Sequence, residues 1–241
     1  MSQPTALVIG ASRGIGKDLV KKLSAVGYDT YGTVRSHPSD SKTLQADLTD
    51  EDSLKAAATK IDTLDLLVLN GAIAEDEPYL KLDVQRHAEY YQTNVIGPLS
   101  AAAAFLPALR KGKQKTIVFI TSLAGNAGMH KSFYAQPAKD RFPLPKGPYS
   151  ATKAALNMAA VQLYAELEDE GFSVLLVHPG VVESDMGTEM IEKLKDMPPF
   201  PFPVISIDES ATGIAKVIKS HIDAGKPEVR YYQYSGEEGP L

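Results

Sequence analysis

Short apolar runs alternate along this chain with longer stretches whose apolar residues recur every three or four positions. The longer stretches have the period of helices, and the short runs are typical of strands that are covered on both faces. Strands are expected at Thr5–Ile9, Thr30–Val34, Thr43–Gln45, Leu66–Leu69, Thr116–Ile120, Ser173–His178 and Val229–Gln233. Helices are expected after the first strand and at about 53–61, 83–108 and 149–170. The alternation predicts an α/β fold, a single doubly wound domain with a mostly seven-stranded parallel sheet and helices on both faces.

Polar and glycine-containing segments follow several of the expected strands. Asn70 follows the fourth strand, Ser122 the fifth, and His178-Pro179-Gly180 the sixth. Right-handed crossovers bring the carboxyl ends of parallel strands to one edge of the sheet, where such folds bind ligands. We therefore expect these segments to converge on one site.

A glycine-rich turn joins the first strand to the first helix. It reads Gly10-Ala11-Ser12-Arg13-Gly14-Ile15-Gly16. Gly10 permits a tight turn, Gly14 allows the backbone to approach a pyrophosphate, and Gly16 permits close packing of the helix on the strand. The helix N-terminus favours phosphate charge. Although glycine turns without a ligand are common, this position between strand and helix indicates a dinucleotide site.

A tyrosine and a lysine stand four positions apart in Tyr149-Ser150-Ala151-Thr152-Lys153. On a helix this spacing places both side chains on one face. A nearby ammonium favours the phenolate, so Lys153 is expected to lower the pKa of Tyr149 from its ordinary value of about 10. Such a tyrosine can exchange protons at neutral pH. The pair alone is weak evidence, because Tyr and Lys often share solvated helix faces.

Together these motifs resemble the classical short-chain dehydrogenase/reductases. The shared features are Gly-x-x-x-Gly-x-Gly at the first turn, Ser122 after a strand, Tyr149-x-x-x-Lys153, and Pro179-Gly180 after the next strand. The resemblance covers nearly the whole chain, and the segment 231–238 is similar to the carbonyl-reductase-like, C-factor-type branch. It implies a Rossmann fold and a homodimer or homotetramer.

The resemblance also implies four catalytic residues. Tyr149 would supply or remove the proton on the substrate oxygen, and Lys153 would lower its pKa and bind the nicotinamide ribose. Ser122 would donate to the carbonyl oxygen and stabilise its developing negative charge. Asn94 lies within an expected helix, where asparagine is unfavourable; in the family the matching residue kinks the helix and holds a water on the lysine.

Two arginines indicate which cofactor is bound. In NAD-specific sites an acidic residue about twenty positions beyond the glycine turn binds the ribose hydroxyls. Thr33-Val34-Arg35-Ser36 occupies that place here. Arg35 and Arg13 are expected to flank a 2′-phosphate, since planar guanidinium groups suit phosphate. The sequence therefore favours NADP(H), against the alternative of two exposed surface arginines.

Further cofactor contacts follow from the resemblance. Asp47, followed by Leu48, resembles the aspartate that contacts adenine, although it could instead cap a helix. Asn70-Gly71-Ala72 replaces the usual Asn-Ala-Gly order. The Val182 backbone and the Ser184 hydroxyl would hold the nicotinamide carboxamide. The expected cofactor-binding residues are Gly10, Ser12, Arg13, Gly14, Ile15, Gly16, Arg35, Asp47, Leu48, Asn70, Gly71, Tyr149, Lys153, Pro179, Gly180, Val182 and Ser184.

The chain departs from the family in the spacing of its catalytic residues. Tyr149 follows Ser122 by 27 residues, whereas in most relatives the interval is about a dozen. Tyr134 has the usual spacing but lacks a lysine four residues later, so Tyr149 is preferred. The proline-rich segment 126–148 is expected to be a loop inserted at the active site, and a second flap is expected at about 183–203. Aromatic residues of the insertion (Phe133, Tyr134 and Phe142) and apolar residues of the flap (Met186, Met190, Met197, Phe200 and Phe202) are expected to enclose the substrate, and the insertion's basic residues to favour an acidic one.

Composition narrows the class of protein. The chain has 241 residues, a net charge of -5 and no cysteine. This balance argues against a nucleic-acid-binding surface and against disulfides or thiolate chemistry. No apolar run is long enough to span a membrane, no signal peptide is apparent, and the dispersed histidines, His178 included, are interpreted as structural and not as metal ligands. We expect one domain over 1–241, in the cytoplasm, acting on a small molecule.

These observations predict an NADP(H)-dependent oxidoreductase that interconverts a carbonyl compound and its alcohol by hydride transfer. Two alternatives stay open. One is a 3-ketoacyl-carrier reductase, and the other is a regulatory protein that senses NADP(H) without turnover.

Overall fold

A parallel sheet of seven strands forms the centre of the molecule. The computed structural model describes residues 3–36, 38, 40–75, 77–81, 83–137, 147–195 and 202–239. The strand order is β3-β2-β1-β4-β5-β6-β9. The strands are β1 (Thr5–Ile9), β2 (Asp29–Val34), β3 (Thr43–Gln45), β4 (Leu66–Leu69), β5 (Thr116–Ile120), β6 (Ser173–His178) and β9 (Val229–Gln233). The predicted doubly wound fold is confirmed, and a separate parallel pair, β7 (Val181–Val182) with β8 (Val204–Ile205), lies beyond the sheet.

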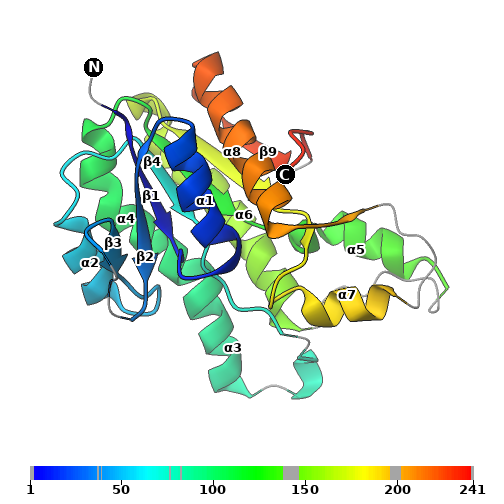
Figure 1. Ribbon diagram of the computed structural model, residues 1–241. Coiled ribbons are helices and arrows are strands. Elements are labelled where there is room, and N and C mark those ends of the chain that lie inside the picture. Colours follow the sequence, from blue (N-terminus) through cyan, green and yellow to red (C-terminus); the bar gives the residue numbers. More distant parts are fainter. Residues whose placement is uncertain are drawn as a thin grey trace.

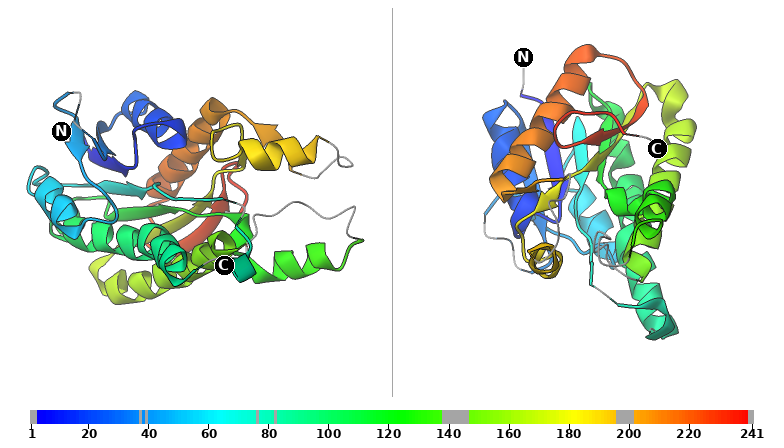
Figure 2. Two further views of the ribbon diagram at one scale, coloured as in Figure 1. Left: turned by 90° about the horizontal axis from the view of Figure 1, so that it is seen from below. Right: turned by 90° about the vertical axis from the view of Figure 1, so that its right-hand side faces the viewer.

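Helices cover both faces of the sheet (Figure 1). The helices α1 (Gly14–Ala25) and α8 (Ile207–Ala224) pack together on one face. The other face carries α2 (Glu51–Ala58), α4 (Gly97–Lys111) and α6 (Pro148–Leu167). Figure 2 shows these two layers edge-on, with α3 (Val84–Tyr91) extending below the sheet. Short 3-10 turns occur at Tyr79–Lys81, Leu123–Gly125 and Glu168–Glu170.

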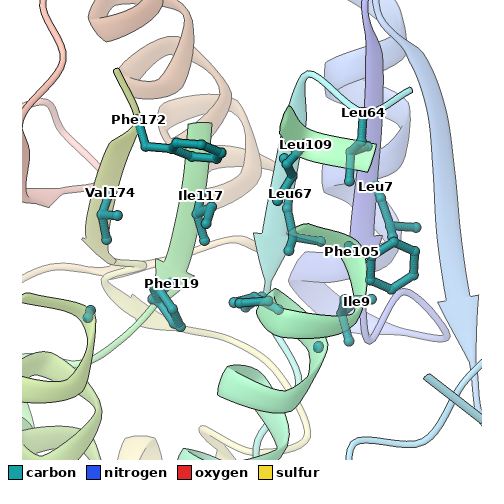
Figure 3. Close-up of a cluster of buried hydrophobic side chains, with 14 of the residues drawn as sticks. Leu7, Ile9, Leu64, Leu67, Phe105, Leu109, Ile117, Phe119, Phe172 and Val174 are labelled. Carbon is teal, nitrogen blue, oxygen red and sulfur yellow. The ribbon is translucent and has the colours of Figure 1, made fainter. Parts of the chain in front are cut away.

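Each face of the sheet buries its own apolar cluster, because successive residues of a strand point to opposite faces. Leu7 and Ile9 of β1 contribute to the cluster under α4, and Ala6 and Val8 to the cluster under α1 and α8. Figure 3 shows the first cluster, in which Phe105 of α4 lies beside β1. Burying one such Leu or Phe side chain contributes about 1.5–3 kcal/mol. The clusters therefore hold the strands in register beneath the site.

The helix expected at 83–108 is present but irregular. It consists of α3, a π turn at Gln92–Ile96 and α4, which ends at Lys111. A π turn adds one residue to a helical turn and is frequent at functional sites. Asn94 lies within it and is fully buried. The sequence signal of an unfavourable asparagine thus coincides with the break in the helix.

The expected loop at 126–148 is wrong in its first part. Helix α5 occupies Ala127–Tyr134, and residues 138–146 lie outside the described residues. Asn126 caps this helix by accepting a hydrogen bond from the Met129 N–H at 2.8 Å. Phe133 is buried against Val181. The prolines all follow Ala135, so they do not prevent the helix before them.

Two further helices were not among the sequence expectations. Helix α8 begins where Ser206 Oγ accepts from the Glu209 N–H at 3.1 Å, and it buries Ile214 and Ile218. Helix α7 (Thr188–Leu194) lies in the expected flap. Within the described part of the chain, no helix combines the length and the apolar character needed to cross a membrane.

Candidate active site

A fixed backbone turn lies beyond the carboxyl end of β1. Because β1 pairs with β2 on one side and β4 on the other, the strand order reverses here, and the connections leave a crevice between them. Gly10 has a φ of +82°, and a Cβ there would lie 2.9 Å from the Gly71 backbone. The Gly10 N–H donates to Thr33 Oγ1 at 3.0 Å, and its carbonyl accepts from Asn70 Nδ2 at 3.0 Å. β2 and the end of β4 thus hold the turn from both sides.

Helix α1 opens onto this turn without a capping side chain. Arg13 is the N-cap residue and makes no side-chain bond to the first amides, and the first turn holds no acidic residue. These amides and the helix dipole therefore favour an anion. Gly16 brings the helix close, since a Cβ there would lie 2.2 Å from the Gly10 carbonyl oxygen. The observed turn fits the diphosphate of a dinucleotide.

Most of the expected cofactor residues line one cavity of about 340 Å³. Three do not: Gly16 packs below the turn, while Gly180 and Val182 line a second, adjacent cavity. The expected residues in the first cavity are Gly10, Ser12, Arg13, Gly14, Ile15, Arg35, Asp47, Leu48, Asn70, Gly71, Tyr149, Lys153, Pro179 and Ser184. Segments far apart in the sequence therefore meet around these two adjacent cavities.

The two arginines lie at the same cavity in different settings. Arg13 forms an exposed ion pair with Asp185, which an incoming anion could replace at little cost because exposed pairs are weak. The Arg35 carbonyl accepts from Gln45 Nε2 at 3.3 Å, which ties this residue to the end of β3. No carboxylate replaces Arg35 at the end of β2.

The Asp47 carboxylate accepts hydrogen bonds from its own loop. Its Oδ1 accepts from the Thr49 N–H and from Thr49 Oγ1, both at 2.8 Å. Asp50, rather than Asp47, caps α2. The helix-capping alternative for Asp47 is therefore excluded, and its carboxylate remains on the cavity wall.

Ser122, Tyr149 and Lys153 come together where the two cavities meet. Tyr149 lines both cavities, Ser122 lines the second and Lys153 the first. Ser122 hydrogen-bonds to Tyr149 and also accepts from the Ala124 N–H at 3.1 Å. Gly125 brings this turn against α6, since a Cβ there would lie 2.8 Å from the Lys153 carbonyl carbon. The spacing of 27 residues in sequence thus does not separate the serine from the tyrosine.

Burial shifts the pKa values of this pair in opposite directions. It raises the pKa of Tyr149, and the Ser122 hydrogen bond lowers it in part. It lowers the pKa of Lys153 to about 8. The Lys153 ammonium lies 5.8 Å from the centre of the Tyr149 ring and donates to the Ile120 carbonyl at 2.9 Å. The expected lowering of the tyrosine pKa by Lys153 is therefore absent here, because desolvation outweighs the charge at this distance.

The Asn94 side chain serves the surrounding backbone. Its Oδ1 accepts from the Ile73 N–H at 2.9 Å, and its Nδ2 donates to the Ile73 carbonyl at 2.9 Å and to Thr152 Oγ1 at 3.0 Å. Thr152 in turn donates to the Tyr149 carbonyl at 2.7 Å. Asn94 thus joins the segment after β4 to the first turn of α6. None of these side-chain hydrogen bonds reaches Lys153, and the water-holding role of Asn94 stays a prediction.

The second cavity, of about 140 Å³, is predominantly apolar. Met129 and Phe133 of α5 line it, and so do Met186, Met190 and Phe202 of the expected flap. Both α5 and α7 project from the same end of the molecule (Figures 1 and 2). Tyr134 is 59% exposed and does not line the cavity. Phe142, Met197 and Phe200 lie outside the described residues.

Three contributors to the site were missed or read differently from the sequence. Thr33 accepts a hydrogen bond from the glycine turn, and Thr152 donates one to the Tyr149 carbonyl within α6. Neither threonine has a local sequence signal for this role. His178 lines the second cavity and bonds to the Leu123 N–H. Its position directly before Pro179-Gly180 was the available signal.

Comparisons with known proteins agree with this geometry. A family model described as short chain dehydrogenase matches residues 4–195. An uncharacterized oxidoreductase of Schizosaccharomyces pombe is 30% identical over 95% of this chain and 94% of its own length. One of Saccharomyces cerevisiae is 32% identical over 99% and 98%, respectively. The structure of NADPH-bound carbonyl reductase from chicken fatty liver superposes with a TM-score of 0.78, at 26% identity, covering 100% of this chain and 95% of that one.

Proposed function

This chain belongs to the short-chain dehydrogenase family, and on that premise we propose that it is an NADP(H)-dependent oxidoreductase that interconverts a ketone or aldehyde and its alcohol. The observation that carries the proposal is the position of Tyr149, which lines both the first cavity, beside the glycine turn, and the second, apolar cavity. A group at this junction can reach a substrate oxygen while that substrate lies against the cofactor. The NADPH-bound carbonyl reductase with the same fold supports the choice.

The reaction needs a hydride and a proton. A bound nicotinamide supplies or accepts the hydride. Tyr149 supplies the proton to the carbonyl oxygen, or removes it from the alcohol in the reverse direction. Ser122, already hydrogen-bonded to Tyr149, donates to the same oxygen and stabilises its negative charge. Lys153 lines the first cavity, where it would bind the nicotinamide ribose of the cofactor.

Two features support NADP(H) over NAD(H). Arg35 stands at the end of β2, where a carboxylate would bind the ribose hydroxyls of NAD. Arg13 lines the same cavity, and a 2′-phosphate bound there would replace Asp185 as the ion-pair partner of its guanidinium. A guanidinium bonds a phosphate in two places, which ammonium groups cannot do.

The cofactor preference can be tested by titration. Arg35→Asp should weaken NADPH binding by about 10- to 100-fold and change NADH binding by only a few-fold, because a charge-assisted bond contributes about 1.5–3 kcal/mol. Lys60→Asp is the matched control, since it makes the same charge change at an exposed position away from the cavity. Equal affinity of the wild type for the two cofactors would contradict the proposal.

The activity can be tested by following NADPH oxidation with aldehydes, diketones and acyl thioesters, alongside a binding assay. We expect turnover of aldehydes or ketones. Turnover confined to the acyl thioesters would instead identify a 3-ketoacyl-carrier reductase. Tight NADPH binding with no turnover of any compound would identify a cofactor-sensing protein.

A further inference from the structure

A neutral hydrogen-bond donor stands in the wall of the apolar cavity. His178 is 7% exposed, and its Nδ1 accepts from the Leu123 N–H at 3.4 Å. That bond fixes the tautomer: the proton is on Nε2. Burial lowers the pKa of His178 to about 4, so the ring is uncharged at neutral pH.

The Nε2 atom is available to a ligand. It has no hydrogen-bond partner among the described residues. One side-chain polar atom of the described residues is both shielded from solvent and without a hydrogen-bond partner, and it is the Tyr231 hydroxyl, not His178 Nε2. The His178 Nε2 atom is therefore not fully shielded from solvent, and His178 is one of the residues that line the cavity. A donor in this position is satisfied only when something in the cavity accepts its hydrogen bond.

The other polar side chains that line the cavity already form hydrogen bonds within the protein. Ser122 and Tyr149 are hydrogen-bonded to each other at the point of reaction. Ser184 accepts from the Gly187 N–H at 3.3 Å and donates to the Val182 carbonyl at 3.4 Å. The described residues that line the cavity include no Asp, Glu, Lys or Arg. Of the basic residues expected in this wall, His130 and Lys131 do not line the cavity, and Lys139, Arg141 and Lys146 lie outside the described residues.

We infer that His178 is a specificity-determining residue that donates a hydrogen bond to a second, uncharged oxygen of the substrate. Because the ring is bonded to the residue after Ser122, this oxygen lies close to the reacting carbonyl. The favoured class is 1,2- and 1,3-dicarbonyl compounds with an apolar remainder. The inference rests on the proposed carbonyl reduction.

Two variants separate the two nitrogen atoms of the ring. In His178→Asn, the side-chain oxygen can keep the bond to the Leu123 N–H, but the shorter side chain has no donor at the Nε2 position. In His178→Gln, the longer side chain places an amide donor near that position. Thermal unfolding of both variants establishes that they are folded before kinetics are compared.

The measurement is the ratio of kcat/KM for 1-phenyl-1,2-propanedione to that for phenylacetone, with NADPH saturating. The intrinsic reactivity of each compound cancels when this ratio is compared between proteins. His178→Asn should lower it by about tenfold, the effect of one hydrogen bond, and His178→Gln should retain most of it. An unchanged ratio in a folded His178→Asn variant, or an equal fall in both variants, would overturn the inference alone. Failure of the wild type to reduce either compound would overturn the proposed function and this inference together.

Discussion

Two tyrosines compete for the catalytic role on sequence grounds, and their surroundings differ. Tyr149 is hydrogen-bonded to Ser122 where the two cavities meet. Tyr134 is 59% exposed on α5, near the ring of His130. Only a hydroxyl that reaches the substrate oxygen can transfer its proton.

Tyr149→Phe should lower kcat by about 100- to 10,000-fold, because it removes the general acid without changing the ring volume. NADPH affinity should change little, as measured by fluorescence titration. Tyr134→Phe is the matched control and should retain nearly full activity. The opposite result for the two variants would assign the chemistry to Tyr134.

Lys153 reduces the stability of the fold at neutral pH. Its pKa falls from 10.5 to about 8 on burial. Below pH 8 it is charged in both the folded and unfolded states, and the full penalty of about 3 kcal/mol applies. Between pH 8 and 10.5 the unfolded state binds the additional proton, so the lysine's contribution to stability rises with pH.

Lys153→Met should therefore raise the free energy of unfolding by about 2 kcal/mol at pH 7, after subtracting about 1 kcal/mol for the lost bond to the Ile120 carbonyl. The advantage over the wild type should shrink from pH 8, reach zero near pH 10 and become a deficit of about 1 kcal/mol above pH 10.5, where only the lost bond counts. Urea unfolding at each pH measures it, with Lys216→Met, at an exposed site, as the control. A variant less stable than the wild type at pH 7 would contradict the predicted penalty.

At the scale of elements, the insertion contributes a helix with one face toward the substrate. Met129 and Phe133 of α5 line the apolar cavity, and Phe133 packs with Val181 and the apolar residues of α7. Residues of α5 and α7 thus line the cavity from different parts of the chain, and both helices project from the same end of the molecule (Figure 2).

Phe133→Ala should change substrate selectivity more than cofactor binding. Removing the ring enlarges the cavity, so kcat/KM for small carbonyl compounds should fall at least several-fold relative to bulky ones, while NADPH affinity stays within about twofold. Tyr134→Ala, the adjacent exposed position, should leave the selectivity unchanged. Equal effects of the two substitutions would mean that α5 does not contact the substrate.

The elements also show which parts of this structure were predictable. Every strand of the seven-stranded sheet could be predicted from the sequence, because fully buried strands such as Leu66–Leu69 are continuous apolar runs. The glycine turn and Tyr149-x-x-x-Lys153 were equally readable, because their chemistry depends on local spacing. Helix α5 was not, because its stability comes from the Asn126 cap and from contacts with Val181 across the site. The neutral state of His178 likewise arises from burial, which no local pattern encodes.

At the scale of the whole molecule, one face of α6 is apolar and uncovered. Ala151, Ala154 and Met158 follow one another at helical spacing, and Met158 is 62% exposed. Small and apolar residues on one helix face permit close contact with the same face of a second copy. We therefore keep the prediction of a homodimer or homotetramer.

Met158→Glu should shift the assembly toward monomers, because it places a charge in the interface. Light scattering across micromolar concentrations measures the mass. Val26→Glu makes the same kind of change at an exposed position at the end of α1, on the opposite face of the sheet, and should leave the assembly intact. A monomeric wild type would contradict the predicted interface.

The strand order has a consequence for synthesis on the ribosome. A nascent chain that has emerged as far as β4 already contains β1, β2 and β3, and with them the glycine turn and Arg35. Its β4 edge consists of four apolar residues and has no neighbour until β5 emerges, after 46 intervening residues. Unpaired apolar edges attract other chains. Pairing with β5 is therefore a step at which a slow ribosome or a missing chaperone would divert this protein into aggregates.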